Sequence, residues 1–257
     1  MSQPLGIGDI APESVLLAGA GSAILLQLAN PAIGYGVARH SDFAANPLRR
    51  LHGTLAYIYA HSNGTREQQA KARLAVQRAH QPVKSAATST HPAYDAGDPA
   101  LQLWVAATLY DAGMRVHGRV FAALPHGDAE AVYRDYGVLG TALGMPAALW
   151  PPTIVEFRKY WDAQLASLSV DDTIRGVARE LLAARNAPWW IKAIMPLVRF
   201  LTVGLLPTSV RDMYRFRWSK RQENLLGILF KAAAVAVKVL PPWIRHAPMR
   251  FYLKRLG

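Results

Sequence analysis

The chain contains no cysteine among its 257 residues. This absence excludes disulfide bonds, iron–sulfur clusters, cysteine-rich zinc sites and thiolate ligation of a metal cofactor. A glycine-rich loop that cradles phosphate and an HExxH motif that places two histidines on a metal are also missing. Nucleotide-phosphate chemistry and a zinc-protease centre are therefore not indicated.

Acidic residues are scarce in the last quarter of the chain. The whole chain holds 29 Lys and Arg against 17 Asp and Glu, a formal net charge of +12. Residues 1–184 hold 15 of each sign, whereas residues 185–257 hold 14 basic and only 2 acidic side chains. The entire excess of 12 positive charges therefore lies in residues 185–257, and anionic membrane surfaces and nucleic acids are the usual partners of such a segment.

The alternation of apolar and polar residues that marks β-strands is almost absent, while helix start and stop signals recur along the chain. The pattern predicts an all-α fold, a single-domain bundle of about eight helices. Residues 13–29 are predicted to form a buried core helix, and residues 31–47 a connection rich in glycine and proline. Asp98 and Thr153 are placed to cap the helices that follow them, and Asp171-Asp172 starts a further helix that runs through Ala184. Residues 1–184 form the predicted helical core, and residues 185–257 a basic part packed on that core or facing a membrane.

The first twelve residues do not have the basic stretch followed by an apolar run that marks a secretory signal. A cytoplasmic location is therefore expected. Contact with the inner face of the membrane is left open by the basic last quarter.

Two apolar runs in that quarter carry cations at a spacing of seven residues. Lys192 and Arg199 lie in APWWIKAIMPLVRFLTVGLLP, and Lys231 and Lys238 in LLGILFKAAAVAVKVLPP. Such runs suit a helix in a membrane interface or one that lines an apolar tunnel, and core helices with a solvated basic edge are the alternative. The basic–aromatic stretch RDMYRFRWSKRQ joins them, but no helix-turn-helix, zinc or RNP-like motif accompanies it, so a membrane surface is favoured over nucleic acid.

A candidate site lies in residues 48–82, where two predicted helices flank a turn at His61-Ser62-Asn63-Gly64. Arg50 and Thr54 are four residues apart and share a helix face with Gly53 beside them, and the second helix ends at His80 before Pro82. An imidazole that faces a cation, a hydroxyl and a small residue can hold haem, because haem iron takes an axial histidine and haem propionates favour arginine. A histidine at a helix C-terminus is also often a dipole-stabilised structural residue, which is the alternative for His80.

An ordered series of motifs resembles one protein family. The series is LLQLANPAIGYGVARHSDF, NPLRRLHGT, RAHQPV, Y-D-A-x-D-P, LWVAATL and Y-x-x-x-x-x-LG, and it spans about Leu16 to Pro207. In this order the motifs are similar to those of the MpaB and rubber-oxygenase (latex-clearing protein) family of α-helical haem-b proteins. The resemblance implies a haem pocket, and cleavage of an alkene carbon–carbon bond by dioxygen to give carbonyl products.

The resemblance also implies roles for single residues. His80 matches the proximal haem ligand, and Arg50 and Thr54 match an arginine and a threonine of the haem pocket. Gly53 stands where the rubber oxygenases place a lysine that caps the distal iron, so the distal position here is open or water-filled. Ala106 stands where many relatives have histidine. Both departures argue against polyisoprene itself as the substrate.

Three functions follow as hypotheses. The first is a haem-dependent oxygenase that acts on a lipophilic, isoprenoid-like substrate delivered from a membrane. The second is a helical haem- or lipid-binding protein without turnover, and the third is a nucleic-acid-associated helical protein supported only by the basic quarter. His52 and His40 remain alternative iron ligands.

Overall fold

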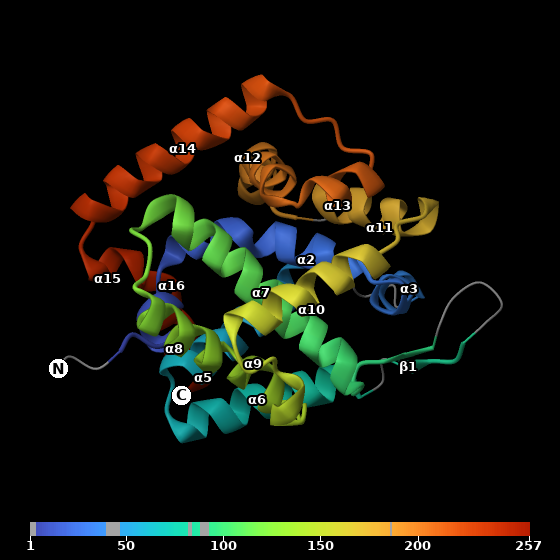
Figure 1. The fold of residues 1–257 in the computed structure, drawn as a ribbon, viewed down its shortest axis with the longest axis horizontal. Helices are drawn as coiled ribbons and strands as arrows, with labels where there is room; N and C mark the ends of the chain where they lie inside the picture. Colours follow the sequence, from blue (N-terminus) through green and yellow to red (C-terminus); the bar gives the residue numbers. More distant parts are fainter. Residues whose placement is uncertain (1–3, 40–46, 82–83, 88–92, 186) are drawn as a thin grey trace.

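Helices make up most of this computed structural model, which describes residues 4–39, 47–81, 84–87, 93–185 and 187–257 (Figure 1). The elements of the first half are α1 (Ile7–Ile10), the 3₁₀-helix η1 (Ser14–Gly19), α2 (Ala20–Ala29), α3 (Pro31–Arg39), α5 (Pro47–Asn63), α6 (Arg66–His80), β1 (Lys84–Ser85), β2 (Tyr94–Asp95) and α7 (Pro99–Val120). Those of the second half are α8 (His126–Tyr136), α9 (Val138–Thr141), the 3₁₀-helix η2 (Ala147–Leu149), α10 (Ile154–Ser167), α11 (Asp172–Ala183), α12 (Trp189–Leu205), α13 (Thr208–Met213), α14 (Lys220–Val239), α15 (Pro242–Arg245) and α16 (Ala247–Leu256).

The all-α prediction is confirmed, but the predicted number of helices, about eight, is too low. Eight of the helices in the described ranges are eleven residues or longer, and these are the ones that periodicity detects. The others have ten residues or fewer, and several are single turns of four to six residues, too short for a periodic signal. The two-residue strands β1 and β2 pair as a small antiparallel hairpin.

The predicted core helix at residues 13–29 is divided into η1 and α2. Both segments are packed closely: a Cβ at Gly19 would lie 2.8 Å from the Ala112 carbonyl oxygen of α7, and one at Gly21 would lie 2.0 Å from Thr202 Oγ1 of α12. These two glycines therefore admit neighbouring helices. The burial predicted for this segment is confirmed, since most residues of α2 are inaccessible to solvent.

The prediction that residues 31–47 form a connection is wrong for its first half, because Pro31–Arg39 is the helix α3. The Asn30 side chain accepts hydrogen bonds from the Ala32 and Ile33 amides, and Pro31 occupies the first helical turn, where its missing N–H costs nothing. Within this helix the neighbours require glycine at two positions. A Cβ at Gly34 would meet the Leu28 carbonyl, and one at Gly36 would meet the Tyr94 ring. Residues 40–46, with His40, lie outside the described part of the chain.

The predicted caps at Asp98 and Thr153 are confirmed: Asp98 accepts a hydrogen bond from Ala100 N (2.7 Å) and Thr153 from Glu156 N (3.2 Å). At the predicted start of α11, Asp171 accepts a hydrogen bond from Ile174 N (2.9 Å). The predicted turn at residues 61–64 is displaced, because α5 continues to Asn63 and Thr65 caps α6. Gly64 has no positive φ; its small size is required because a Cβ would lie 2.6 Å from the Ala60 carbonyl oxygen.

The central helix α7 packs against α2, η1, α9 and α14 (Figure 1). The helices of residues 185–257 lie against the rest of the chain: α12 contacts α2, α14 contacts α7, and α16 contacts α5 and α6. In the described part of the chain no single helix has both the length and the apolar character needed to cross a bilayer, although Ser14–Ala29 and Pro31–Arg39, bent by 98°, satisfy the criterion as a pair.

Candidate haem and substrate site

Helix α5 carries three of the predicted site residues on one face. At about 100° of rotation per residue, Arg50, Gly53 and Thr54 lie within an arc of about 100°. All three are exposed. Among the described residues outside its own stretch of helix, no heavy atom lies within 4 Å of the position that a Cβ on Gly53 would occupy. The surface of α5 at Gly53 is therefore open to a bound group.

His80, the last residue of α6, lies near this face. Desolvation of its half-buried imidazole lowers the pKa of His80, and the nearby Arg50 guanidinium lowers it further. Among the residues that the structure describes, no hydrogen-bond partner contacts either ring nitrogen. A neutral imidazole with a free nitrogen is the form that ligates iron, so the donor set at this position fits haem.

Arg50 also acts on Tyr94 of the β-hairpin. Burial raises the pKa of the Tyr94 phenol, and the Arg50 cation opposes that rise. Arg50 is therefore near both an imidazole and a phenol that come from other elements. Its positive charge is suited to bind a haem propionate, as the sequence predicts.

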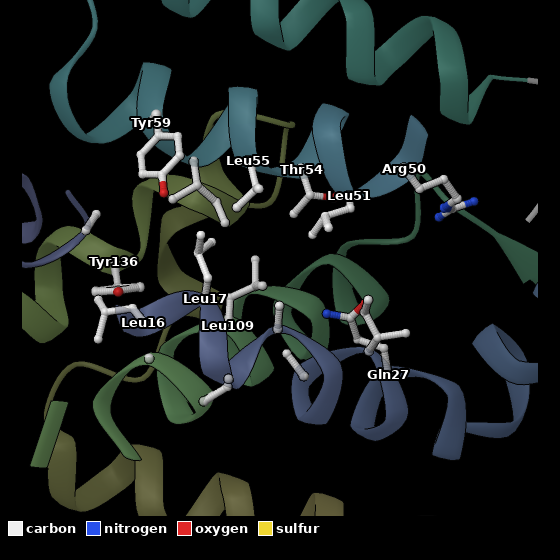
Figure 2. A pocket seen from close by; sticks show the side chains of 18 of the residues that line it. Leu16, Leu17, Gln27, Arg50, Leu51, Thr54, Leu55, Tyr59, Leu109 and Tyr136 are labelled. Atoms are coloured by element: carbon white, nitrogen blue, oxygen red, sulfur yellow. The ribbon is translucent and has the colours of Figure 1, made fainter. Parts of the chain in front are cut away.

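A cavity of about 140 Å³ adjoins the same face of α5. Figure 2 shows Leu51, Thr54 and Leu55 of α5 facing residues of η1, α2 and α7, with Arg50 at one end and Tyr59 and Tyr136 at the other. The walls come mainly from η1, α2, α5 and α7 and are predominantly apolar. Its lining residues are Ala11, Leu16, Leu17, Gly19, Ala20, Ala23, Ile24, Gln27, Arg50, Leu51, Thr54, Leu55, Ile58, Tyr59, Leu109, Ala112, Gly113, Tyr136 and Leu181.

Sequence reasoning identified Arg50 and Thr54 of this cavity but missed its other polar residues. Gln27 of α2 donates a hydrogen bond to Thr108 Oγ1 (2.9 Å) and lines the cavity opposite α5. Tyr59 and Tyr136 come from α5 and α8. Tyr59 follows Thr54 by five residues on the same helix, so sequence spacing could have identified it. Gln27 and Tyr136 reach the cavity only through tertiary packing.

The structure separates His52 from the site. Its Nδ1 lies at hydrogen-bonding distance from the Tyr252 hydroxyl of α16, and the two rings are in contact. His52 is two residues after Arg50, so its side chain leaves a different face of α5. Ala106 is buried in the core on α7 and does not line the cavity.

The site thus combines an apolar cavity, lined by Arg50 and Thr54, with the nearby imidazole of His80 in an all-helical fold. The family model described as "ER-bound oxygenase mpaB/B'/Rubber oxygenase, catalytic domain" matches residues 9–239. The chain therefore belongs to this oxygenase family, as the motif series predicted.

Relatives and a solved structure agree with this assignment. The uncharacterized proteins Mb2261 of Mycobacterium bovis and Rv2237 of Mycobacterium tuberculosis are each 35% identical over 228 residues, which cover 86% of this chain and 89% of theirs. A structure of latex clearing protein LCP in the closed state is similar with a TM-score of 0.58 and 16% identity, covering 95% of this chain and 70% of that one. At this identity the similarity establishes the shared fold.

Substitution of Gly53 by lysine tests the open position on α5. Because no described heavy atom lies within 4 Å of a Cβ placed on Gly53, a lysine there would have room beside α5. If His80 holds haem, we expect the absorption spectrum of the haem-loaded G53K protein to differ from that of the wild type. Gly127, which also has open space around it, provides the control G127K. The same spectrum in G53K, G127K and wild type would contradict this arrangement.

Proposed function

We propose that the protein is a haem-b-dependent oxygenase that uses dioxygen to cleave or oxidise a C=C bond of a lipophilic, isoprenoid-like substrate. The observation that carries the proposal is the apolar cavity whose edge, at Arg50 and Thr54, lies on the helix face near the His80 imidazole, for which the described residues offer no hydrogen-bond partner. Apolar pockets with few polar groups are typical of sites for lipophilic ligands.

The chain supplies binding, orientation and exclusion of water. His80 would ligate the iron through its neutral imidazole, and Arg50 would neutralise a propionate. When bound, haem supplies the redox chemistry with dioxygen that amino-acid side chains cannot provide. In a cleavage reaction the atoms balance without a further reductant, because one alkene and one O₂ give two carbonyl groups.

Thr54 and the cavity walls act on the substrate. An alkene offers no charge to bind, so van der Waals contact with leucine and isoleucine side chains such as Leu51, Leu55 and Ile58 has to hold it. The Thr54 hydroxyl would donate a hydrogen bond at the edge of the cavity. Because most of the lining between the two ends of the cavity is apolar, water has few partners there and is readily displaced by a lipophilic ligand.

Oxygen uptake tests the activity. Purified protein loaded with haem is expected to consume dioxygen when short prenyl alcohols or prenylated quinones are added, and to yield carbonyl products that react with a hydrazine reagent. The variant Thr54→Val keeps the shape of the side chain without its hydroxyl, and we expect a lower rate with unchanged haem content. Haem binding without any substrate-dependent oxygen uptake would instead indicate a non-catalytic haem- or lipid-binding protein.

The outer face of α14 carries an apolar stripe that suggests how such a substrate reaches the protein. Its residues recur at intervals of three and four, which places them on one side of the helix, opposite Leu226 and Phe230 of the core. Lys231 and Lys238 lie beside the stripe. The exposed residues of the stripe are Leu225, Ile228, Ala232, Val235 and Val239.

Helix α12 has a similar exposed face. Trp189 and Trp190 at its start are 80% and 53% exposed, and Ile194 and Leu197 follow. Of sixteen large hydrophobic side chains that are exposed among the described residues, twelve lie in residues 189–251. We define the exposed apolar and basic side chains of α12 and α14 as the apolar–basic surface.

We propose that the apolar–basic surface binds a membrane rich in anionic lipid. The positive charge of residues 185–257 complements anionic head groups, and amphipathic helices with tryptophan on their apolar face insert into this interface. A lipid-soluble substrate would then be available beside the protein.

A further inference from the structure

Two tyrosines lie at the end of the cavity that is remote from Arg50 (Figure 2). Tyr59 belongs to α5 and Tyr136 to the end of α8, and the side chains are almost completely buried, with 2% and 4% of their surface exposed. They are close enough for the phenols to influence one another electrostatically. The cavity therefore has a polar end opposite its Arg50 and Thr54 edge.

Neither phenol hydroxyl has a hydrogen-bond partner within the described part of the chain. This is unusual, because buried tyrosine hydroxyls nearly always have one. Tyr57 donates to the Leu139 carbonyl (2.9 Å), Tyr133 to that of Pro151 (2.6 Å) and Tyr214 to that of Leu25 (2.8 Å). Buried Tyr110 also has no hydrogen-bond partner among the described residues, but it does not line the cavity. The hydroxyls of Tyr59 and Tyr136 are thus left available to a group inside the cavity.

Both phenols are neutral donors near pH 7. Burial raises the pKa of Tyr59 to about 12, and burial likewise raises the pKa of Tyr136. A neutral O–H can donate to a carbonyl or hydroxyl oxygen and can also accept from a hydroxyl. A hydrocarbon would leave both groups without a partner, which has a cost in free energy.

We propose that Tyr59 and Tyr136 bind an oxygen atom at one end of the ligand. The ligand class of this cavity is then an isoprenoid alcohol or carbonyl compound, whereas a pure hydrocarbon such as polyisoprene is disfavoured. This inference rests on the proposed function only for the statement that the ligand is the substrate of an oxygenase.

The dimensions of the cavity limit the bound segment. Tyr59 follows Thr54 by five residues, a rise of about 7.5 Å along the helix. A volume of about 140 Å³ is close to that of an engineered cavity of about 150 Å³ that holds one benzene molecule. The volume therefore accommodates about one five-carbon unit with its oxygen.

Two probes of matched shape test the proposal. Prenol (3-methylbut-2-en-1-ol) carries a hydroxyl where 2-methylpent-2-ene carries a methyl group, and the two molecules otherwise coincide. Their dissociation constants are measured by ligand-observed NMR on the wild type and on the double variant Tyr59→Phe/Tyr136→Phe. Each probe is compared only with itself across the variants, because water solvates prenol more strongly than the hydrocarbon.

We expect the double variant to bind prenol about tenfold more weakly, from the loss of two net hydrogen bonds, and to bind 2-methylpent-2-ene at least as tightly as the wild type does. Tyr57→Phe is the matched control on the same helix, since the Tyr57 hydroxyl bonds to the Leu139 carbonyl and does not line the cavity. It should leave both dissociation constants unchanged.

The proposal is wrong if prenol binds equally well to the wild type and the double variant, or if both probes weaken together. Circular dichroism establishes that each variant is folded. The experiment needs neither bound haem nor turnover. A negative haem spectrum would therefore refute the proposed function while leaving the prenol result to decide the role of the tyrosines.

Discussion

Replacement of His80 by alanine is expected to give a folded protein that no longer binds haem stoichiometrically. His80 supplies the one imidazole that the described structure places near Arg50 without a hydrogen-bond partner, and the chain has no cysteine that could replace it. Because His80 is the last residue of α6, its loss should cost little folding stability. Haem titration, followed by the Soret absorbance, measures the effect.

Two other histidines of α5 provide the controls. His52→Ala removes the contact with Tyr252, and His61→Ala removes a contact with the Tyr57 carbonyl, so both variants should keep full haem stoichiometry. Added imidazole should restore part of the Soret band of His80→Ala, because it can occupy the space of the lost side chain. Full haem retention in His80→Ala, with loss in His52→Ala or His40→Ala, would assign the ligand elsewhere.

Substitution of two apolar residues on the outer face of α14 by glutamate is expected to abolish most of the binding to anionic liposomes. Ile228 and Val235 are 61% and 63% exposed, and inserting two such side chains into the interface contributes roughly 3 kcal/mol, so the variant Ile228→Glu/Val235→Glu should bind about a hundredfold more weakly. Repulsion between the glutamates and anionic lipid adds to this loss. Flotation with vesicles that contain phosphatidylserine measures it.

Salt and a matched variant identify the source of the binding. High salt should weaken wild-type flotation without abolishing it, because salt screens the basic side chains but not the apolar contact. The control Leu74→Glu/Val155→Glu changes side chains of similar exposure, 48% and 60%, on α6 and α10, and should float like the wild type.

Other partners of the apolar–basic surface would give different results. No flotation of the wild type at low salt, together with DNA retention that falls steeply with salt, would indicate nucleic acid. A dimer in sedimentation that the α14 variant dissociates would indicate a second copy of the chain. Either outcome contradicts the membrane proposal.

The sequence predicted the helical class and the helix starts because both depend on local chemistry. Asp98, Thr153 and Asp171 cap the helices that they precede, and each cap involves residues at most three positions apart. The prediction for residues 31–39 was wrong because glycine and proline usually interrupt helices. Here Asn30 and Pro31 begin a helix, and the close approach of Leu28 and Tyr94 requires Gly34 and Gly36.

The candidate site was predictable only where its residues are neighbours on a helix. Arg50, Gly53 and Thr54 share a face by spacing alone, whereas Gln27 and Tyr136 reach the cavity from α2 and α8 through tertiary packing. His117 shows the same limit. Tertiary packing buries it on α7 against Phe121, and desolvation lowers its pKa.

The ultraviolet–visible spectrum of the freshly purified protein tests the central claim most directly. If His80 and Arg50 hold haem b beside the apolar cavity, the protein should show a Soret band, either as purified or after addition of one equivalent of haemin, that saturates at one haem per chain and is lost in His80→Ala. A protein that remains colourless and gives no saturable Soret band with haemin would contradict the haem site and the oxygenase activity that depends on it.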